Sequence, residues 1–208
     1  MYLQAFPAGP LFTNSYIIAC DATKEAAIID AAPGSAASIE KFIRDNNFQC
    51  KHLLLTHSHW DHIADTSKYK ELFDLQVHVH ALDLPNLEQP GADQLPCPLL
   101  LPSIKPDLFL DEATPLKVGE LLVEVIHTPG HSPGSVCFYV RNYGVLISGD
   151  TLFKSAVGNI SFPTSRPELM ASSLAKLQAL PEQTKVFPGH GPTTSILSEQ
   201  RTFQHNMH

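Results

Sequence analysis

The seven residues from Thr56 to His62 read THSHWDH and contain three histidines and one aspartate. His57 and His59 are two positions apart and directly follow a short apolar run. In an extended chain residues i and i+2 point to the same side, so both imidazole rings can reach one metal ion. Asp61 and His62 follow where the chain turns, and their side chains can reach a point beside the first. The stretch therefore predicts a metal-binding loop.

Three further polar residues come after later apolar runs, and each stands beside a glycine. His131 lies in HTPGHSPGS, Asp150 ends LISGD, and His190 lies in VFPGHG. Functional side chains gather at strand ends in α/β proteins, and glycine lets backbone segments approach closely. If these residues had only a structural role, the polar side chains at four separate strand ends would all have to find hydrogen-bond partners in the core by coincidence. The pattern favours one metal site assembled from all four.

Short strands and helices alternate along the chain and must position these side chains. SYIIAC, EAAIID, KHLLLT and QVHVH predict strands, with a helix at Ile39, Phe42 and Ile43 and helical spacing in IADTSKYKELF. LLVEVIHT, SVCFYV, GVLISGD and KVFPGHG predict later strands, with RNYG as a hairpin turn. The segment SRPELMASSLAKLQAL predicts a helix that Ser165 and Glu168 begin as a capping box. Strands and then helices in each half predict α/β layers packed face to face.

Residues 84–106 differ from the rest because six of them are proline. Proline at this density is incompatible with regular elements, so we predict a long irregular loop. Such a loop is either functional or an inert surface excursion.

Length and composition limit the kind of protein. The 208 residues are enough for one domain with a sizeable core, and we expect a single domain over residues 1–208. The net charge of −7 argues against nucleic acid as a partner, because phosphate binding needs a basic face. No apolar run approaches the ~18 residues that span a bilayer, and no signal peptide is evident. Four widely spaced cysteines predict reduced thiols, so we expect a cytoplasmic enzyme without a membrane partner.

The motifs THSHWDH, GHSPGS, SGD and PGHG resemble those of the metallo-β-lactamase superfamily. GDTLF, FPGHGPTT and SEQRT further resemble short, single-domain hydrolases similar to glyoxalase II. The resemblance implies an α/β fold, a four-layer αβ/βα sandwich with the metal site at one edge of the paired sheets. It also implies two ions, the first held by His57, His59 and His131, the second by Asp61, His62 and His190, and both bridged by Asp150.

The chemistry that the resemblance implies is hydrolysis of an acyl bond. Two ions about 3.5–4 Å apart can share one hydroxide, and metal binding lowers the pKa of water towards ~7. Zinc is the expected ion, and iron or manganese suit the same ligands. Asp61 would orient the hydroxide or accept a proton, and Asp150 would act as the bridge. The expected substrate is a small thioester or ester, with a glutathione thioester as the specific candidate.

One substrate contact departs from the glyoxalase II-like pattern. Those enzymes have a lysine or arginine nine residues after the bridging aspartate, where this chain has Asn159. Asn159 cannot form the charge-assisted pair with a glutathione carboxylate, which would be about twice as strong as a neutral hydrogen bond. Lys154 and Arg166 are cations close to Asn159 in the sequence. Two interpretations are open: they supply the missing positive charge, or they are solvated surface residues. We expect Lys154 and Asn159 to contact the substrate.

The same ligands leave other functions open. A persulfide dioxygenase with one iron ion resembles this sequence at the same histidines and aspartates. A nucleic-acid-processing member of the fold is disfavoured by the acidic charge. His78 and His80 alternate on a predicted strand, and we interpret them, together with His52, as packing residues rather than ligands.

Overall fold

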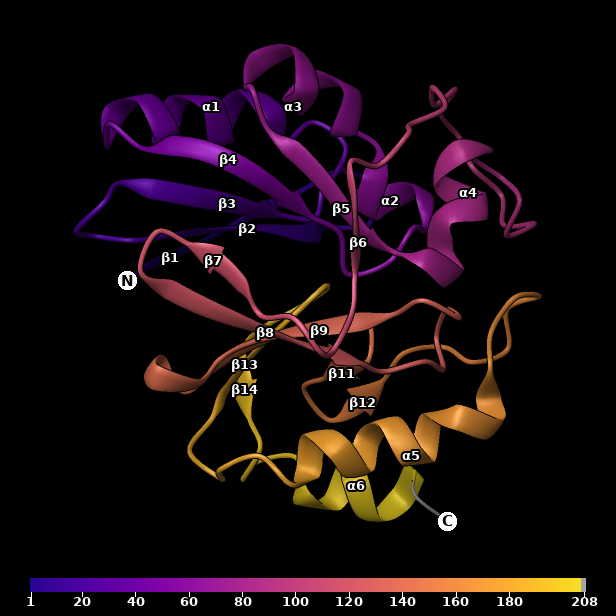
Figure 1. Cartoon of the computed structure of the whole chain (residues 1–208). Coiled ribbons are helices and arrows are strands. Elements are labelled where there is room, and N and C mark those ends of the chain that lie inside the picture. The colour runs from indigo at the N-terminus through magenta and orange to yellow at the C-terminus, as the bar shows by residue number, and fades with distance from the viewer. Residues whose placement is uncertain (207–208) are drawn as a thin grey trace.

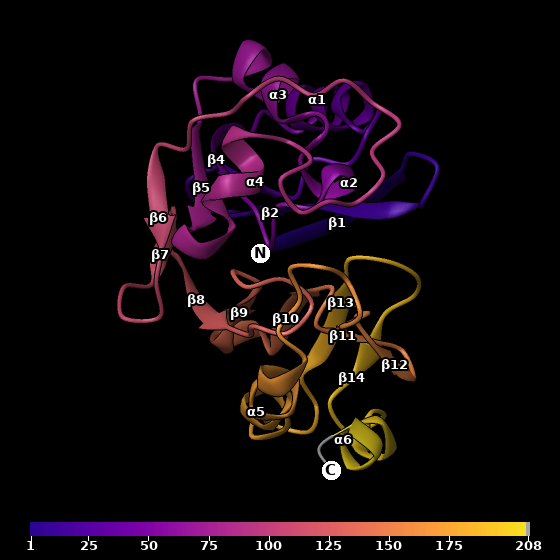
Figure 2. The ribbon, with the colours of Figure 1, turned by 90° about the vertical axis from the view of Figure 1, so that its right-hand side faces the viewer.

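The computed structural model describes residues 1–206, and its two six-stranded sheets pack face to face (Figure 1). The helices α1 and α3 lie on the outer side of the first sheet, and α5 and α6 lie on the outer side of the second (Figures 1 and 2). The layer order is therefore helix, sheet, sheet, helix. This arrangement confirms the four-layer αβ/βα sandwich that the sequence resemblance implied.

The first sheet has the order β1-β2-β3-β4-β5-β6. Its strands are β1 (Tyr2–Ala8), β2 (Thr13–Ala19), β3 (Glu25–Ile29), β4 (Gln49–Leu54), β5 (Gln76–His80) and β6 (Leu108–Leu110). The pairs β1/β2 and β2/β3 are antiparallel, whereas β3 to β6 run parallel to one another. Consequently β3, β4 and β5 all end at the same edge of the sheet.

The second sheet has the order β14-β13-β10-β9-β8-β7. Its strands are β7 (Leu116–Val118), β8 (Leu121–His127), β9 (Val136–Val140), β10 (Val145–Gly149), β13 (Lys185–Pro188) and β14 (Thr194–Ser195). β8 and β10 both run antiparallel to β9, and β13 runs parallel to β10. The carboxyl ends of β8, β10 and β13 therefore share one edge. A small hairpin of β11 (Leu152–Phe153) and β12 (Ala156–Val157) follows β10.

The helices largely match the apolar spacing of the sequence. They are α1 (Ala36–Asp45), α2 (Trp60–Ile63), α3 (Thr66–Leu72), α4 (Leu84–Glu88), α5 (Pro167–Gln178) and α6 (Gln200–Asn206), with short 3₁₀ turns η1 (Ala81–Asp83) and η2 (Arg141–Tyr143). The predicted RNYG hairpin turn is η2 followed by Gly144 in the left-handed region, and it joins β9 to β10. No helix within residues 1–206 is long and apolar enough to cross a membrane.

Two local predictions were wrong. The proline-rich segment was expected to hold no regular element, yet its first residues form α4, with Pro85 in the first turn, where proline's missing N–H is tolerated. The expected capping box at α5 is absent: the helix begins at Pro167, and no side chain caps it. The Ser165 hydroxyl donates instead to the carbonyl oxygen of His131 at 2.8 Å, so a tertiary contact replaces the local one.

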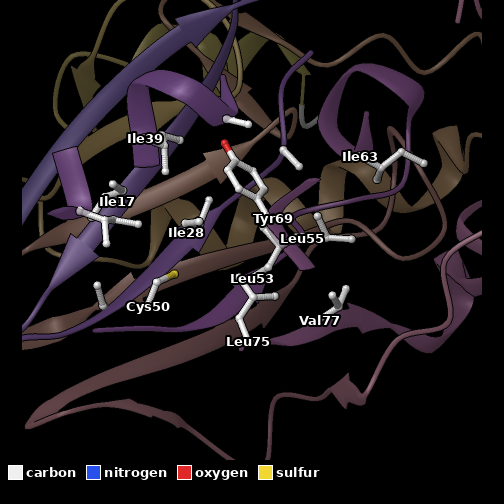
Figure 3. Packing of buried hydrophobic residues seen from close by; sticks show 14 of the residues in the cluster. Ile17, Ile28, Ile39, Cys50, Leu53, Leu55, Ile63, Tyr69, Leu75 and Val77 are labelled. Atoms are coloured by element: carbon white, nitrogen blue, oxygen red, sulfur yellow. The ribbon is translucent and has the colours of Figure 1, made fainter. Parts of the chain in front are cut away.

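Three apolar clusters hold the layers together, because central strands are buried on both faces. On β2, Ile17 packs toward the helices α1 and α3, while Ile18 packs toward the second sheet. Figure 3 shows the first of these clusters, in which Ile39 from α1 and Tyr69 from α3 meet Leu53 from β4. A third cluster joins the second sheet to α5 and α6. All four cysteines are free thiols, as predicted.

Candidate metal centre

The predicted ligands converge at the strand ends of the two sheets. β4 leads into the loop with His57 and His59, and the first turn of α2 carries Asp61 and His62. In the second sheet, each of the three strands that run in the same direction is followed by one predicted ligand. His131 follows β8, Asp150 follows β10, and His190 follows β13. A bridge between Thr13 and His190 joins the two sheets at this edge. The fold thus brings together side chains that are up to 133 positions apart in the sequence (190 − 57).

The ligand atoms form two groups of three with a third group between them. In each group the atoms lie within 4.8 Å of one another. The groups are His57, His59 and His131; Asp61, His62 and His190; and His57, His62 and Asp150. We call the first two the three-histidine group and the mixed group.

Asp150 lies between these two groups. Its Oδ2 is 3.4 Å from Nε2 of both His131 and His190, and its Oδ1 is 3.4 Å from Nε2 of His62. One carboxylate therefore faces both groups, as a bridging ligand must.

Several buried polar atoms in the centre have no hydrogen-bond partner in the protein. They include Nε2 of His57, His59 and His131, and Oδ1 of Asp150. Burying polar atoms without partners is costly, so such atoms normally point to an additional ligand. Divalent cations such as zinc accept imidazole nitrogen and carboxylate oxygen as ligands. The residues present fit a metal centre.

Hydrogen bonds from outside the centre orient the imidazole rings. Nδ1 of His62 is 2.8 Å from Oδ2 of Asp30, and Nδ1 of His131 is 2.9 Å from the carbonyl oxygen of Asn159. Nδ1 of His190 is 3.1 Å from the carbonyl oxygen of Leu11. These acceptors place the proton on Nδ1 and leave Nε2 as the inward-facing ligand atom.

The neighbouring carboxylates make the mixed group favour positive charge. Burial alone lowers the pKa of His62, but Asp61, Asp150 and Asp30 together raise it to about 9. Burial likewise opposes protonation of His190, yet the carboxylates of Asp150 and Asp61 raise its pKa to about 10. In return, the pKa of Asp150 falls to about 2 because of nearby histidines, although burial raises it. The three carboxylates therefore stabilise positive charge at this group, either a proton on an imidazole or a metal ion in the place of that proton.

The three-histidine group behaves differently. Burial, followed by the neighbouring imidazoles, holds the pKa of His57 well below its ordinary value. Burial also lowers the pKa of His59 to about 3, with His131 as the next cause. Neutral imidazole is the form that binds a metal ion, so this group is ready to bind near neutral pH.

A cavity of 260 Å³ opens beside His59. It is lined by a mixture of apolar and polar side chains from η1, α4 and the loops after β4 and β8, among them Leu82, Asp83 and Asn86, and by Arg166 at the start of α5. Lys154 and Asn159 are exposed and do not line this cavity. The Asn159 side chain accepts a hydrogen bond from the backbone of Ser161 at 2.8 Å. The substrate contacts of Lys154 and Asn159 stay predictions, whereas Arg166 is placed at the cavity.

Comparison with known proteins identifies the family. The profile of the metallo-beta-lactamase superfamily matches residues 8–190. This chain belongs to that superfamily. "Probable metallo-hydrolase YqgX" of Bacillus subtilis (strain 168) is 33% identical over 205 residues, covering 96% of this chain and 95% of that protein. "Hydroxyacylglutathione hydrolase" of Pelagibacter ubique (strain HTCC1062) is 32% identical over 179 residues, covering 85% of this chain and 65% of that protein.

Two solved structures agree with this assignment. The BLEG-1 B3 metallo-beta-lactamase has a TM-score of 0.88 and 35% identity, with 96% of this chain and 97% of that chain covered. TTHA1623 in a di-iron-bound form has a TM-score of 0.79 and 34% identity, with 96% and 98% covered. Membership in the superfamily and the metallo-hydrolase relative support a metal-binding hydrolase.

Sequence reasoning missed three polar residues around the centre of this superfamily member. Asp30 follows β3 and accepts hydrogen bonds from the backbone and hydroxyl of Thr56 at 2.7 and 2.8 Å. The hydroxyl of Thr13 donates to Oδ2 of Asp61 at 2.6 Å. Asp83, after β5, contacts two of the ligand-bearing loops. Asp30 ends an apolar run as the predicted ligands do, so that signal was present; Thr13 and Asp83 have no comparable signal.

Proposed function

We propose that this protein is a dinuclear metal-dependent hydrolase that cleaves small thioesters or esters. The observation that carries the proposal is the position of Asp150, whose carboxylate faces both the three-histidine group and the mixed group. The di-iron form of a relative that is 34% identical supports two ions, and zinc, iron and manganese all suit these ligands.

The chain's own residues prepare the centre for this chemistry. Two divalent ions held there would lower the pKa of a bound water to about 7 and supply a nucleophile at neutral pH. Asp61 is fixed by the Thr13 hydroxyl, so its carboxylate is held in place to orient a water or accept a proton. Asp150 is held between the histidines on either side. A thiolate leaving group needs little protonation, so no further acid is required.

The cavity beside His59 is the place where we position the acyl part of the substrate. Its volume of 260 Å³ suits a small molecule, and Arg166 on its rim offers a planar cation to a substrate carboxylate. The hydroxyacylglutathione hydrolase relatives, about one-third identical, support a thioester as the substrate class. Asn159 replaces the cation expected for glutathione, so we propose small thioesters in general rather than glutathione thioesters alone. We infer a small molecule rather than nucleic acid, because the net charge is −7.

The test combines metal analysis with an activity panel. The purified protein is loaded with zinc, manganese or iron, its metal content is measured, and it is assayed on thioesters, esters and lactones, with chelator-treated protein as the control. We expect two ions per chain and metal-dependent thioester turnover. Stoichiometric metal without turnover of any of these substrates would exclude the proposed activity. Oxygen consumption with glutathione persulfide and one iron per chain would instead establish the dioxygenase alternative.

A further inference from the structure

Asp83 is a buried carboxylate that touches two ligand-bearing loops without being a ligand itself. It lies at the end of η1, just after β5, and only 3% of its surface is exposed. It belongs to none of the three metal-ligand groups within the described residues. Its hydrogen bonds reach residues 25, 49 and 51 positions away in the sequence.

The first contact is with the loop after β4. Oδ2 of Asp83 accepts a hydrogen bond at 2.8 Å from the backbone N–H of Ser58, the residue between His57 and His59. The carbonyl oxygen of the same Ser58 accepts a hydrogen bond from the side-chain amide of Asn86 in α4. Both polar backbone groups of Ser58 are thus held from the short segment 81–88.

The second contact is with the loop after β8. Oδ2 of Asp83 also accepts a bond from the Ser132 hydroxyl at 2.9 Å, and Oδ1 accepts one from the backbone N–H of Gly134 at 2.6 Å. Ser132 directly follows His131. Gly134 is required for this approach, because a Cβ there would lie 2.6 Å from Oδ1 of Asp83. One carboxylate therefore ties together the loops that carry all three members of the three-histidine group.

We propose that Asp83 is a positioning residue that sets the spacing of His57, His59 and His131, and thereby the affinity of the three-histidine group for its metal ion. Ser58 and His59 come from the first half of the fold and His131 from the second. One backbone hydrogen bond, from the N–H of Val136 to the carbonyl oxygen of Thr56 at 2.8 Å, joins the bases of the two loops, and the Asp83 carboxylate joins them nearer to the histidines. The inference rests on the proposed metal centre and not on the identity of the substrate.

The decisive comparison is between Asp83→Ala and Asp83→Asn. Asparagine fills the same space, but it has one acceptor oxygen, and its amide N–H would face a backbone N–H of Ser58 or Gly134. If Asp83 only fills space, asparagine restores the wild-type behaviour. If Asp83 holds the loops through its two acceptor oxygens, both variants lose metal affinity.

The control is Glu199→Gln. Glu199 is equally buried and also accepts three hydrogen bonds, from the backbone of Ser155 at 2.8 Å and from the hydroxyls of Thr194 and Thr202 at 2.5 and 2.6 Å. These hydrogen bonds reach neither the loop after β4 nor the loop after β8, which carry the three-histidine group. This variant therefore shows how the loss of a buried carboxylate affects folding when the contacts between the loops after β4 and β8 are left unchanged.

Zinc affinity is measured by competition with a chromophoric chelator, and the stability of the metal-free proteins is measured by urea unfolding. We expect both Asp83 variants to bind the first ion roughly 10–100-fold more weakly than wild type, as is typical when an outer-shell partner is lost. Glu199→Gln should bind zinc like wild type. Unchanged zinc affinity in Asp83→Asn would overturn the proposal, and a wild type that binds no zinc would instead refute the metal centre itself.

Two milder variants keep the test informative if the Asp83 variants do not fold. Ser132→Ala removes one of the three hydrogen bonds to Asp83, and Asn86→Ala removes the bond to the Ser58 carbonyl oxygen. Each should lower zinc affinity by a smaller factor, and the double variant should lower it further. Wild-type zinc affinity in the double variant would contradict the positioning role.

Discussion

Removing the Asp150 side chain is the sharpest test of the proposed two-ion centre. The carboxylate approaches His62 through Oδ1, and His131 and His190 through Oδ2, each at 3.4 Å. It is therefore shared by the three-histidine group and the mixed group. The variant Asp150→Ala leaves every histidine in place but removes the ligand that we propose the two ions share.

The size of the effect follows from the number of metal bonds lost. Losing an outer-shell partner already costs about 10–100-fold in metal affinity, and a direct ligand costs at least as much. Because each of the two ions loses one ligand, the affinity for the pair should fall by at least about 10²–10⁴-fold. Turnover of a thioester should fall below detection at ordinary zinc concentrations.

The assay is stepwise zinc competition followed by thioester turnover at saturating zinc. Asp150→Asn serves as the matched variant, because it keeps one oxygen for one ion and removes the charge. We expect it to retain the first ion and to lose the second. If Asp150→Ala still binds two zinc ions tightly and turns over substrate at the wild-type rate, Asp150 is not a bridge.

Three further predictions test the surroundings of the centre. Gly189→Ala would place a Cβ 2.1 Å from Oδ1 of Asp150, so we expect this variant to bind zinc more weakly in a chelator competition assay. A zinc affinity equal to that of wild type would show that the position of this carboxylate is not important for binding. Arg166→Ala should raise KM roughly 10-fold more for a thioester that bears a carboxylate than for its neutral analogue, because a charged hydrogen bond contributes about 1.5 kcal/mol or more. Equal changes in KM for the two substrates would show that Arg166 does not recognise the carboxylate. Burial and then His52 lower the pKa of His78 from 6.5 to about 4, so folding favours its neutral form, and stability is lost as the pH falls from 6.5 towards 4. Relative to His78→Phe, the wild type should lose about 2 kcal/mol of unfolding free energy between pH 7.5 and pH 5 in urea titrations, and parallel pH profiles would contradict this.

The strands and the residues at their ends could be predicted from the sequence, and the reason is local. A buried strand reads as a short apolar run, and the polar residue that ends it stands out, as with Asp150 after GVLISG. His57 and His59 could be assigned to one side of the chain because their spacing of two matches the strand period. The structure places all seven predicted ligands in one cluster, and the metal roles of those residues stay predictions.

The surroundings of the ligands could not be predicted, because they depend on which distant segments become neighbours. The Thr13 hydroxyl reaches Asp61 across 48 positions, and Asp83 reaches Gly134 across 51. No periodicity connects such pairs. Ser165 shows the same effect in the other direction. Its sequence position favours a helix cap, but its hydroxyl donates a hydrogen bond to the carbonyl oxygen of His131 instead.

The distribution of ligands between the two sheets explains why neither half of the chain can form the centre alone. His57 and His59 come from the first sheet and need His131 from the second. Asp61 and His62 likewise come from the first sheet and need a histidine that follows β13. Each group of three thus takes two ligands from one half and one from the other, and Asp150 from the second half serves both. Ile18 and Phe138 pack in the apolar cluster between the two sheets, so this cluster holds the two incomplete sets of predicted ligands next to each other.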